Sequence, residues 1–276
     1  MARPRRRRRR SGGEGWKIAA GVGLALVALA GLGGIAWLNA TLEPPPKLDP
    51  DTLCPVDGPR ALTVVLLDVS DDWPDVTKAQ VAKRLLDTAE AMPTYGLLEL
   101  RLLDPADPSG RVLFARCNPG SGEGLSEFTA NPEAVRRAWA AGFRDPVEQI
   151  VDGGFPPAPS DTSPIMAAIQ RIAVERFEGR AAETVPKRLV VVSDMMENTP
   201  AYSQYEGDLG YDRFRASPAF ADLRTDLHGA AVTVLYVQRR TGAGAAPSGD
   251  HIAFWTKWFE EMHGALAEAV KMQGAG

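Results

Sequence analysis

The sequence has few of the residues that build disulfide and metal frameworks, with two cysteines and three histidines among 276 residues. Two cysteines exclude a disulfide-dense scaffold and a four-cysteine zinc site. The histidines share no short metal-ligand spacing, which argues against a histidine-rich metalloenzyme. The Gly-x-Ser-x-Gly pattern, the P-loop and the Rossmann glycine fingerprint are also missing, and with them the support for the enzyme classes that they mark.

Acidic residues outnumber basic ones except at the amino end. Residues 1–17 carry seven arginines and Lys17 against the single acid Glu14, and the rest of the chain has a net charge of −11. An acidic body of this kind argues against a nucleic-acid-binding surface on the folded domain. The arginine run itself has two interpretations, a signal for membrane orientation or a patch for nucleic acid or anionic lipid.

One long uncharged segment, residues 18–38, follows the arginines. At 1.5 Å per residue its 21 residues span about 31 Å as a helix, the thickness of the hydrocarbon layer. We therefore expect a single transmembrane helix, with the basic tail (1–17) in the cytoplasm and the remainder outside it. A cleaved signal peptide is the alternative, although the apolar core is long for one and the sequence after it offers no good cleavage site.

Proline and polar residues dominate residues 39–60, which we interpret as a stiff linker. Residues 61–276 then form the folded domain, in which apolar β-branched runs alternate with stretches of helical periodicity. This alternation predicts an α/β fold with a doubly wound, mostly parallel sheet. The expected strands are 61–68, 97–104, 111–117, 187–194 and 230–238, and the expected helices are 75–92, 132–151, 164–178, 217–228 and one from Asp250 through Val270.

Acidic and hydroxyl side chains follow two of the expected central strands. Asp68, Ser70 and Asp72 follow the first, Asp194 follows the fourth, and Thr162 and Ser163 precede a helix between them. In doubly wound sheets such strand ends meet at one edge, where ligands bind. Hard oxygens without imidazole or thiolate suit Mg²⁺, Mn²⁺ or Ca²⁺ better than zinc.

This pattern resembles the von Willebrand factor A (vWA) family and its metal-ion-dependent adhesion site, whose motif is Asp-x-Ser-x-Ser, then a Thr, then an Asp. Asp68 and Ser70 match the first two positions, Asp72 stands at the second Ser, Ser163 with its neighbour Thr162 stands at the Thr, and Asp194 matches the last. The resemblance implies a vWA-like fold, Mg²⁺ or Mn²⁺ as the cofactor and a role in protein–protein interaction.

The loop after Asp194 is expected to overhang the site. It contains Glu197, Tyr202, Tyr205 and Tyr211, and exposed tyrosines among small polar residues are typical of protein recognition. A loop packed on itself is the alternative.

Cys54 and Cys117 flank the first three expected strands, and an oxidising compartment would allow them to pair. Two free buried thiols are the alternative.

These observations favour a non-enzymatic protein anchored in the inner membrane of a bacterium by one span, with a periplasmic domain that binds or assembles proteins at the envelope. Two alternatives stay open. One is a divalent-metal-dependent nuclease or phosphoesterase that uses Asp68, Asp72, Asp194 and Glu197, and the other is a metal-free scaffold.

Overall fold

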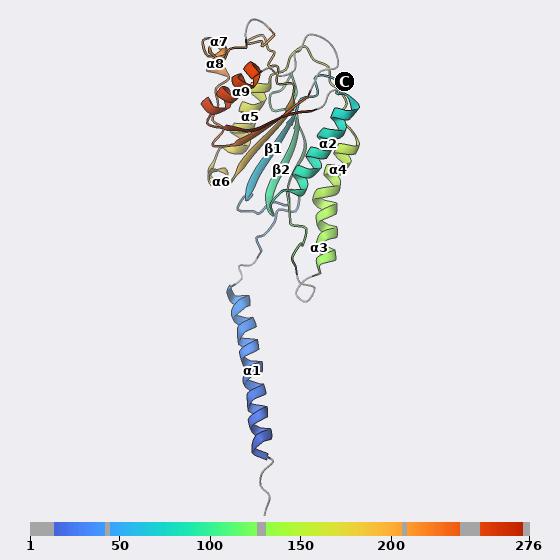
Figure 1. Ribbon diagram of the computed structural model, residues 1–276, viewed down its shortest axis with the longest axis vertical. Coiled ribbons are helices and arrows are strands. Elements are labelled where there is room, and N and C mark those ends of the chain that lie inside the picture. The colour runs from blue at the N-terminus through green and yellow to red at the C-terminus, as the bar shows by residue number, and fades with distance from the viewer. Residues whose placement is uncertain (1–13, 42–44, 126–130, 206–208, 238–248, 273–276) are drawn as a thin grey trace, which may run out of the picture. The chain divides into compact units, whose positions relative to one another are not determined.

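The computed structural model of the chain describes residues 14–41, 45–125, 131–205, 209–237 and 249–272 (Figure 1). The chain divides into two compact units, Met1–Pro46 and Lys47–Gly276.

The first unit contains one long helix, α1 (Glu14–Thr41), which extends the predicted apolar segment at both ends. Its segment Gly15–Ile35 is long and apolar enough to cross a membrane, with a mean hydropathy of 2.2, a property that membrane anchors and signal sequences share. Residues 1–13 of the predicted basic tail lie outside the described residues.

The second unit is built on a six-stranded sheet with the order β3-β2-β1-β4-β5-β6. Only β3 runs antiparallel to its neighbour β2, and the other four pairings are parallel. The predicted doubly wound, mostly parallel sheet is therefore confirmed, and its topological switch point lies between β1 and β4. The strands are β1 (Ala61–Leu67), β2 (Gly96–Leu102), β3 (Arg111–Cys117), β4 (Lys187–Ser193), β5 (Ala231–Tyr236) and β6 (Ala265–Lys271).

Helices cover both faces of this sheet, which explains why β1 and β2 are buried along their whole length (Figure 1). One face packs against α2 and α4 around Leu85 and Phe143, and the other packs against α5 and α9 around Ile169 and Trp255. The helical segments of this unit are α2 (Asp75–Glu90), α3 (Pro132–Trp139), η1 (Ala140–Arg144), α4 (Asp145–Asp152), α5 (Ile165–Ile172), η2 (Ala173–Phe177), α6 (Arg180–Glu183), α7 (Tyr211–Arg215), α8 (Ala219–Asp222) and α9 (Gly249–Glu261).

The carboxyl-terminal segment differs from the prediction. A helix through Val270 was expected, but α9 ends at Glu261 and residues 265–271 form the edge strand β6. A residue with a side chain does not fit at Gly264, because a Cβ there would lie 2.7 Å from a side-chain atom of Leu227. The single helix expected over 217–228 is also wrong, since only the short α8 lies within that range.

The segment before β1 is folded rather than a free linker. Leu48 forms an isolated β-bridge with Pro55, and the amide of Cys117 donates to the carbonyl oxygen of Thr52 at 2.8 Å. A disulfide joins Cys54 to Cys117, as the sequence led us to expect. The linker predicted over 39–60 is therefore wrong for residues 47–60, which form part of the domain.

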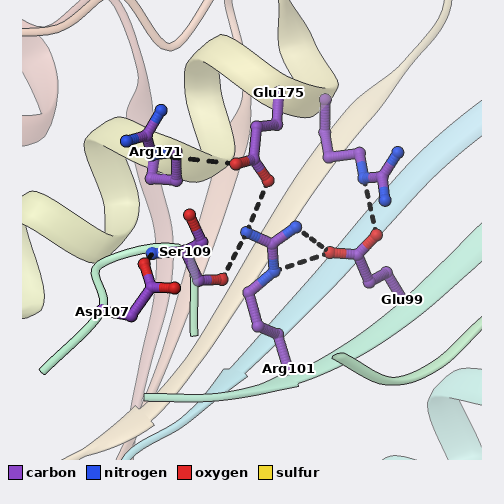
Figure 2. Close-up of polar contacts among 7 residues, drawn as sticks. Glu99, Arg101, Asp107, Ser109, Arg171 and Glu175 are labelled. Carbon is purple, nitrogen blue, oxygen red and sulfur yellow. Dashed lines mark hydrogen bonds and ion pairs between the residues drawn. The ribbon is translucent and has the colours of Figure 1, made fainter. Parts of the chain in front are cut away.

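Strand β2 carries two charged residues that are almost completely buried, Glu99 and Arg101, at 0% and 1% exposure. Figure 2 shows the Arg101 guanidinium held between the carboxylates of Glu99 and Glu175. It also donates to the carbonyl oxygen of Ser109 at 2.8 Å, and Arg176 lies 2.6 Å from the second oxygen of Glu99. These charged side chains thus form one network of hydrogen bonds and ion pairs between strand β2 and the helical segment η2.

Candidate functional site

Asp68 is the centre of the polar cluster at the carboxyl ends of the strands. It directly follows β1, and its amide donates to the carbonyl oxygen of Val192 on β4 at 2.9 Å, which places it at the switch point. Its side chain is buried, at 4% exposure. A carboxylate can be kept there only if hydrogen bonds replace its lost water.

Three serine hydroxyls supply those hydrogen bonds. Ser70 donates to Oδ1 of Asp68 at 2.7 Å, and Ser163 and Ser193 donate to Oδ2 at 3.0 and 2.7 Å. The backbone amide of Ser70 adds a fourth contact at 3.1 Å. The cluster therefore joins the loop after β1, the loop before α5 and the end of β4 through one carboxylate.

Ser193 is the member of this cluster that the sequence analysis missed. It is the last residue of β4, directly before the predicted ligand Asp194, and it is completely buried. Besides donating to Asp68, its hydroxyl accepts the amide of Met195 at 2.8 Å. A hydroxyl beside a strand-end acid was the signal that could have pointed to it.

The loop after β4 is held in an unusual backbone conformation. Met195 has a φ of 62°, a left-handed value that is uncommon for a residue with a side chain. Its carbonyl oxygen accepts the indole N–H of Trp255 at 2.9 Å and lies 3.1 Å from Nε2 of the buried His251. Burial lowers the pKa of His251, and the hydrogen bond with the Met195 carbonyl oxygen opposes this shift. His251 and Trp255 of helix α9 thus anchor the loop that follows β4.

The other predicted metal ligands have different partners. The Asp72 carboxylate pairs with the ammonium of Lys78 at 2.9 Å. The amide of Thr162 donates to the hydroxyl of Ser160, so Ser163 rather than Thr162 reaches Asp68. The Asp194 carboxylate accepts the amide of Met196 at 3.0 Å.

These residues fit a divalent-cation shell poorly. Within the described ranges, no three acidic, histidine or cysteine side chains gather in a way that could hold a metal ion. Among the predicted ligands, Asp68 accepts hydrogen bonds from the hydroxyls of Ser70 and Ser163. Binding of Mg²⁺ or Mn²⁺ stays a prediction.

Glu197 lies in the core and not on the surface, so its predicted direct contact with a partner is wrong. It is completely buried, and its Oε2 accepts the amide of Met166 in the first turn of α5 at 2.9 Å. Its other oxygen, Oε1, is buried and has no hydrogen-bond partner among the described residues. Burial raises the pKa of Glu197 to about 8, and the negative charge of Asp68 adds to this, while backbone amides of Met166 and Ile165 oppose it.

Two of the three tyrosines of this loop are also buried, at 5% for Tyr202 and 6% for Tyr211. Both pack edge-on against Phe214 or Phe254, with ring centroids 4.9 Å apart for Tyr202 and Phe214. They are anchors of a loop that folds back on the domain, which corrects their prediction as an exposed recognition surface. Only Tyr205, at 41% exposure, presents its side chain to solvent.

Comparisons with known proteins bear on the fold alone. No protein-family model and no curated protein matches the chain. Among solved structures, an aerotolerance-related membrane protein from Bacteroides fragilis NCTC 9343, with multiple mutations to serines, is 14% identical, with 77% of this chain and 92% of that chain covered and a TM-score of 0.36. The VWA domain of SpRpn10 is 11% identical, with 78% and 89% covered and a TM-score of 0.37.

A conserved hypothetical protein BatB from Bacteroides thetaiotaomicron is 12% identical, with 78% of this chain and 91% of that chain covered and a TM-score of 0.34. At these values the likeness supports no residue-by-residue correspondence. The domain itself has a six-stranded, doubly wound sheet with helices on both faces (Figure 1).

Proposed function

We propose that this chain is a membrane-anchored protein whose vWA-like domain lies outside the cytoplasm and binds a protein partner with the face around Asp68. Asp68 carries this proposal, because one buried carboxylate joins the loop after β1, the loop before α5 and the end of β4 through Ser70, Ser163 and Ser193. A face assembled in this way is ordered before a partner arrives, so less conformational entropy is lost on binding.

The acids of the alternative hydrolase are poorly arranged for catalysis. Glu197 is buried behind the loop, Asp72 is paired with Lys78, and Asp68 is buried under hydroxyl donors. A two-metal phosphoesterase needs carboxylates that share their ions. The described residues contain no such group, which supports binding over hydrolysis.

The proposed orientation rests on the charge asymmetry around α1. The arginines precede the apolar segment, and positive charge beside a span favours the cytoplasmic side. The disulfide between Cys54 and Cys117 supports an oxidising compartment for the domain.

Site-specific photo-cross-linking in intact cells tests both parts of the proposal. A photoreactive amino acid at exposed Tyr205 should capture a defined partner, whereas the same group at exposed Val56, before β1, should not. Ser163→Val should lose the captured product while the protein remains folded, because the loop before α5 is released from Asp68.

Protease added to spheroplasts, whose cytoplasmic side is sealed and whose periplasmic side is open, should digest the captured product. Equal capture from Tyr205 and Val56, or full protection from the protease, would contradict the proposal.

A further inference from the structure

We propose that the open edge of strand β3, with the groove between β3 and α4, binds an extended acidic segment of a partner protein as an additional strand. This surface is separate from the face around Asp68, because β3 is an edge strand and β2 lies between it and β1. Binding at the two surfaces can therefore succeed or fail independently.

The outer edge of β3 is only partly covered. In an antiparallel strand the backbone groups point in turn toward the neighbouring strand and away from it. The amide of Asn118 donates to Gly96 of β2 at 2.9 Å, and the amide of Cys117 points the other way and donates to the carbonyl oxygen of Thr52 at 2.8 Å. By the same alternation the amide and carbonyl of Ala115 point outward. Among the described residues, no backbone group outside the sheet pairs with them, so the edge is open at Ala115.

A groove of about 400 Å³ lies beside this open edge, between β3 and α4. Leu113 and Phe114 line it from the strand, and Pro146 and Ile150 line it from the helix, so its walls are largely apolar. An extended peptide that adds to a sheet edge forms backbone hydrogen bonds with the strand and places alternate side chains in neighbouring pockets. The edge and the groove together provide both kinds of contact.

The charge of β3 indicates which kind of segment fits. Arg111 and Arg116 lie opposite Leu102 and Leu98 of β2, which belong to the core under α2 and α4, so both arginines project on the face that carries the groove. Arg116 donates to the carbonyl oxygen of Gly142 at 2.9 Å. In the part of the chain that the structure describes, neither arginine forms an ion pair with an acid. A bound segment that carries carboxylates would supply these missing partners.

A second copy of the chain is the alternative occupant of an open edge. The seven residues of β3 include two arginines and no acid. Antiparallel pairing of β3 with its own copy would bring four arginines onto two adjacent strands, and like charges on neighbouring strands repel each other. Charge therefore favours an acidic partner over self-association.

Selection from a peptide library tests the proposal, with the purified full chain in detergent as the target. The library contains random peptides of about ten residues, the upper length of an ordinary strand. We expect the enriched peptides to alternate apolar with acidic residues. Fluorescence anisotropy of one enriched peptide, labelled with fluorescein, then measures its Kd.

Two variants of the chain separate the edge from the charge. Ala115→Pro removes the outward amide, and proline is tolerated on an edge strand where its missing N–H would face solvent. Arg111→Glu combined with Arg116→Glu reverses the charge. Each should raise the Kd of the selected peptide by about tenfold or more. Arg224→Glu is the matched control, because Arg224 is an exposed arginine that precedes β5, on the far side of β1 and β4, and it should bind the peptide like the wild type.

The same peptide with methylated backbone amides tests strand pairing without any change in the protein, and it should not bind. Enrichment of no peptide, or of peptides without acidic residues, would overturn the proposal. So would equal binding of the methylated peptide, or equal binding to wild type and to the charge-reversed variant, once circular dichroism has shown that this variant is folded. Self-association of the wild type that Ala115→Pro abolishes would assign the edge to a second copy instead.

Discussion

Glu197 is an acid whose surroundings favour its protonated form. One oxygen accepts a backbone amide of α5, the other is buried without a hydrogen-bond partner among the described residues, and its pKa is raised from 4.5 to about 8. In the unfolded chain the same group releases its proton near the lower value. Between these two values the native state holds a proton that the unfolded state does not, so the free energy of unfolding falls as the pH rises.

We therefore predict that Glu197→Gln flattens the dependence of stability on pH. The amide has the same shape and cannot ionise, so the variant should gain on the wild type as the pH rises from 4.5 to about 8. Above about pH 8 its advantage should stay constant, on the order of a few kcal/mol. Denaturant unfolding of both proteins from pH 5 to pH 9 measures the difference. Parallel curves across this range would show that the pKa of Glu197 is the same in the native and unfolded states.

At the scale of single elements, β2 shows how a central strand can carry charge. Glu99 and Arg101 point to the same face of the sheet, and each is paired at 1% exposure or less. Removing one partner of such a pair leaves the other charge buried without compensation, whereas apolar replacement of both is often tolerated.

We predict that Glu99→Ala lowers the free energy of unfolding by about 3–5 kcal/mol, because Arg101 and Arg176 would both lose the buried carboxylate that they share. Glu99→Leu combined with Arg101→Met should recover most of that loss. As a control, Asp57→Asn breaks an exposed pair with Arg60 and should cost less than about 1 kcal/mol. Urea titration of the purified chain measures all three, and equal losses for Glu99→Ala and Asp57→Asn would refute the assignment.

The elements also show which features of this fold could be predicted from sequence. The continuous apolar run of β1 and the acid after it indicated a buried parallel strand, and the structure confirms both. The spacing of Leu266 and Val270 led to the wrong prediction of a helix. Residues four positions apart lie on one face of a helix and also on one face of a strand.

The candidate site was only partly predictable, for physical reasons. Asp68, Ser70 and Ser163 converge because strand ends meet at the switch point, which local sequence indicates. Asp72 could not be placed, since its pairing with Lys78 depends on how α2 leaves the loop. The side chains of Tyr202 and Tyr211 are buried because the loop packs on α9, where both rings contact Phe254. The polar composition of the loop gave no sign of this tertiary contact.

At the scale of the whole folded domain, the disulfide joins the segment before β1 to the last residue of β3, across a sequence separation of 63 residues. In the chain-entropy model, closing a loop of this length stabilises the native state by about 4 kcal/mol, because the unfolded chain loses freedom. We predict that Cys54→Ala with Cys117→Ala lowers stability by that amount. Unfolding with and without a reductant measures it, and a wild type whose Tm ignores the reductant would contradict it.

The pairing of β1 with β4 also determines the order in which the strands can pair during synthesis of the chain. Val64 lies opposite Leu189, so more than a hundred residues must be synthesised before the central strand acquires its second neighbour. The nascent chain can already place β2 beside β1 and β3 beside β2, and close the bridge at Cys117. During that interval one edge of the most apolar strand is open to other chains, and such slow, long-range closure exposes folding intermediates to aggregation. The polar cluster at Asp68 comes into existence only at the end of this sequence, when β4 delivers Ser193.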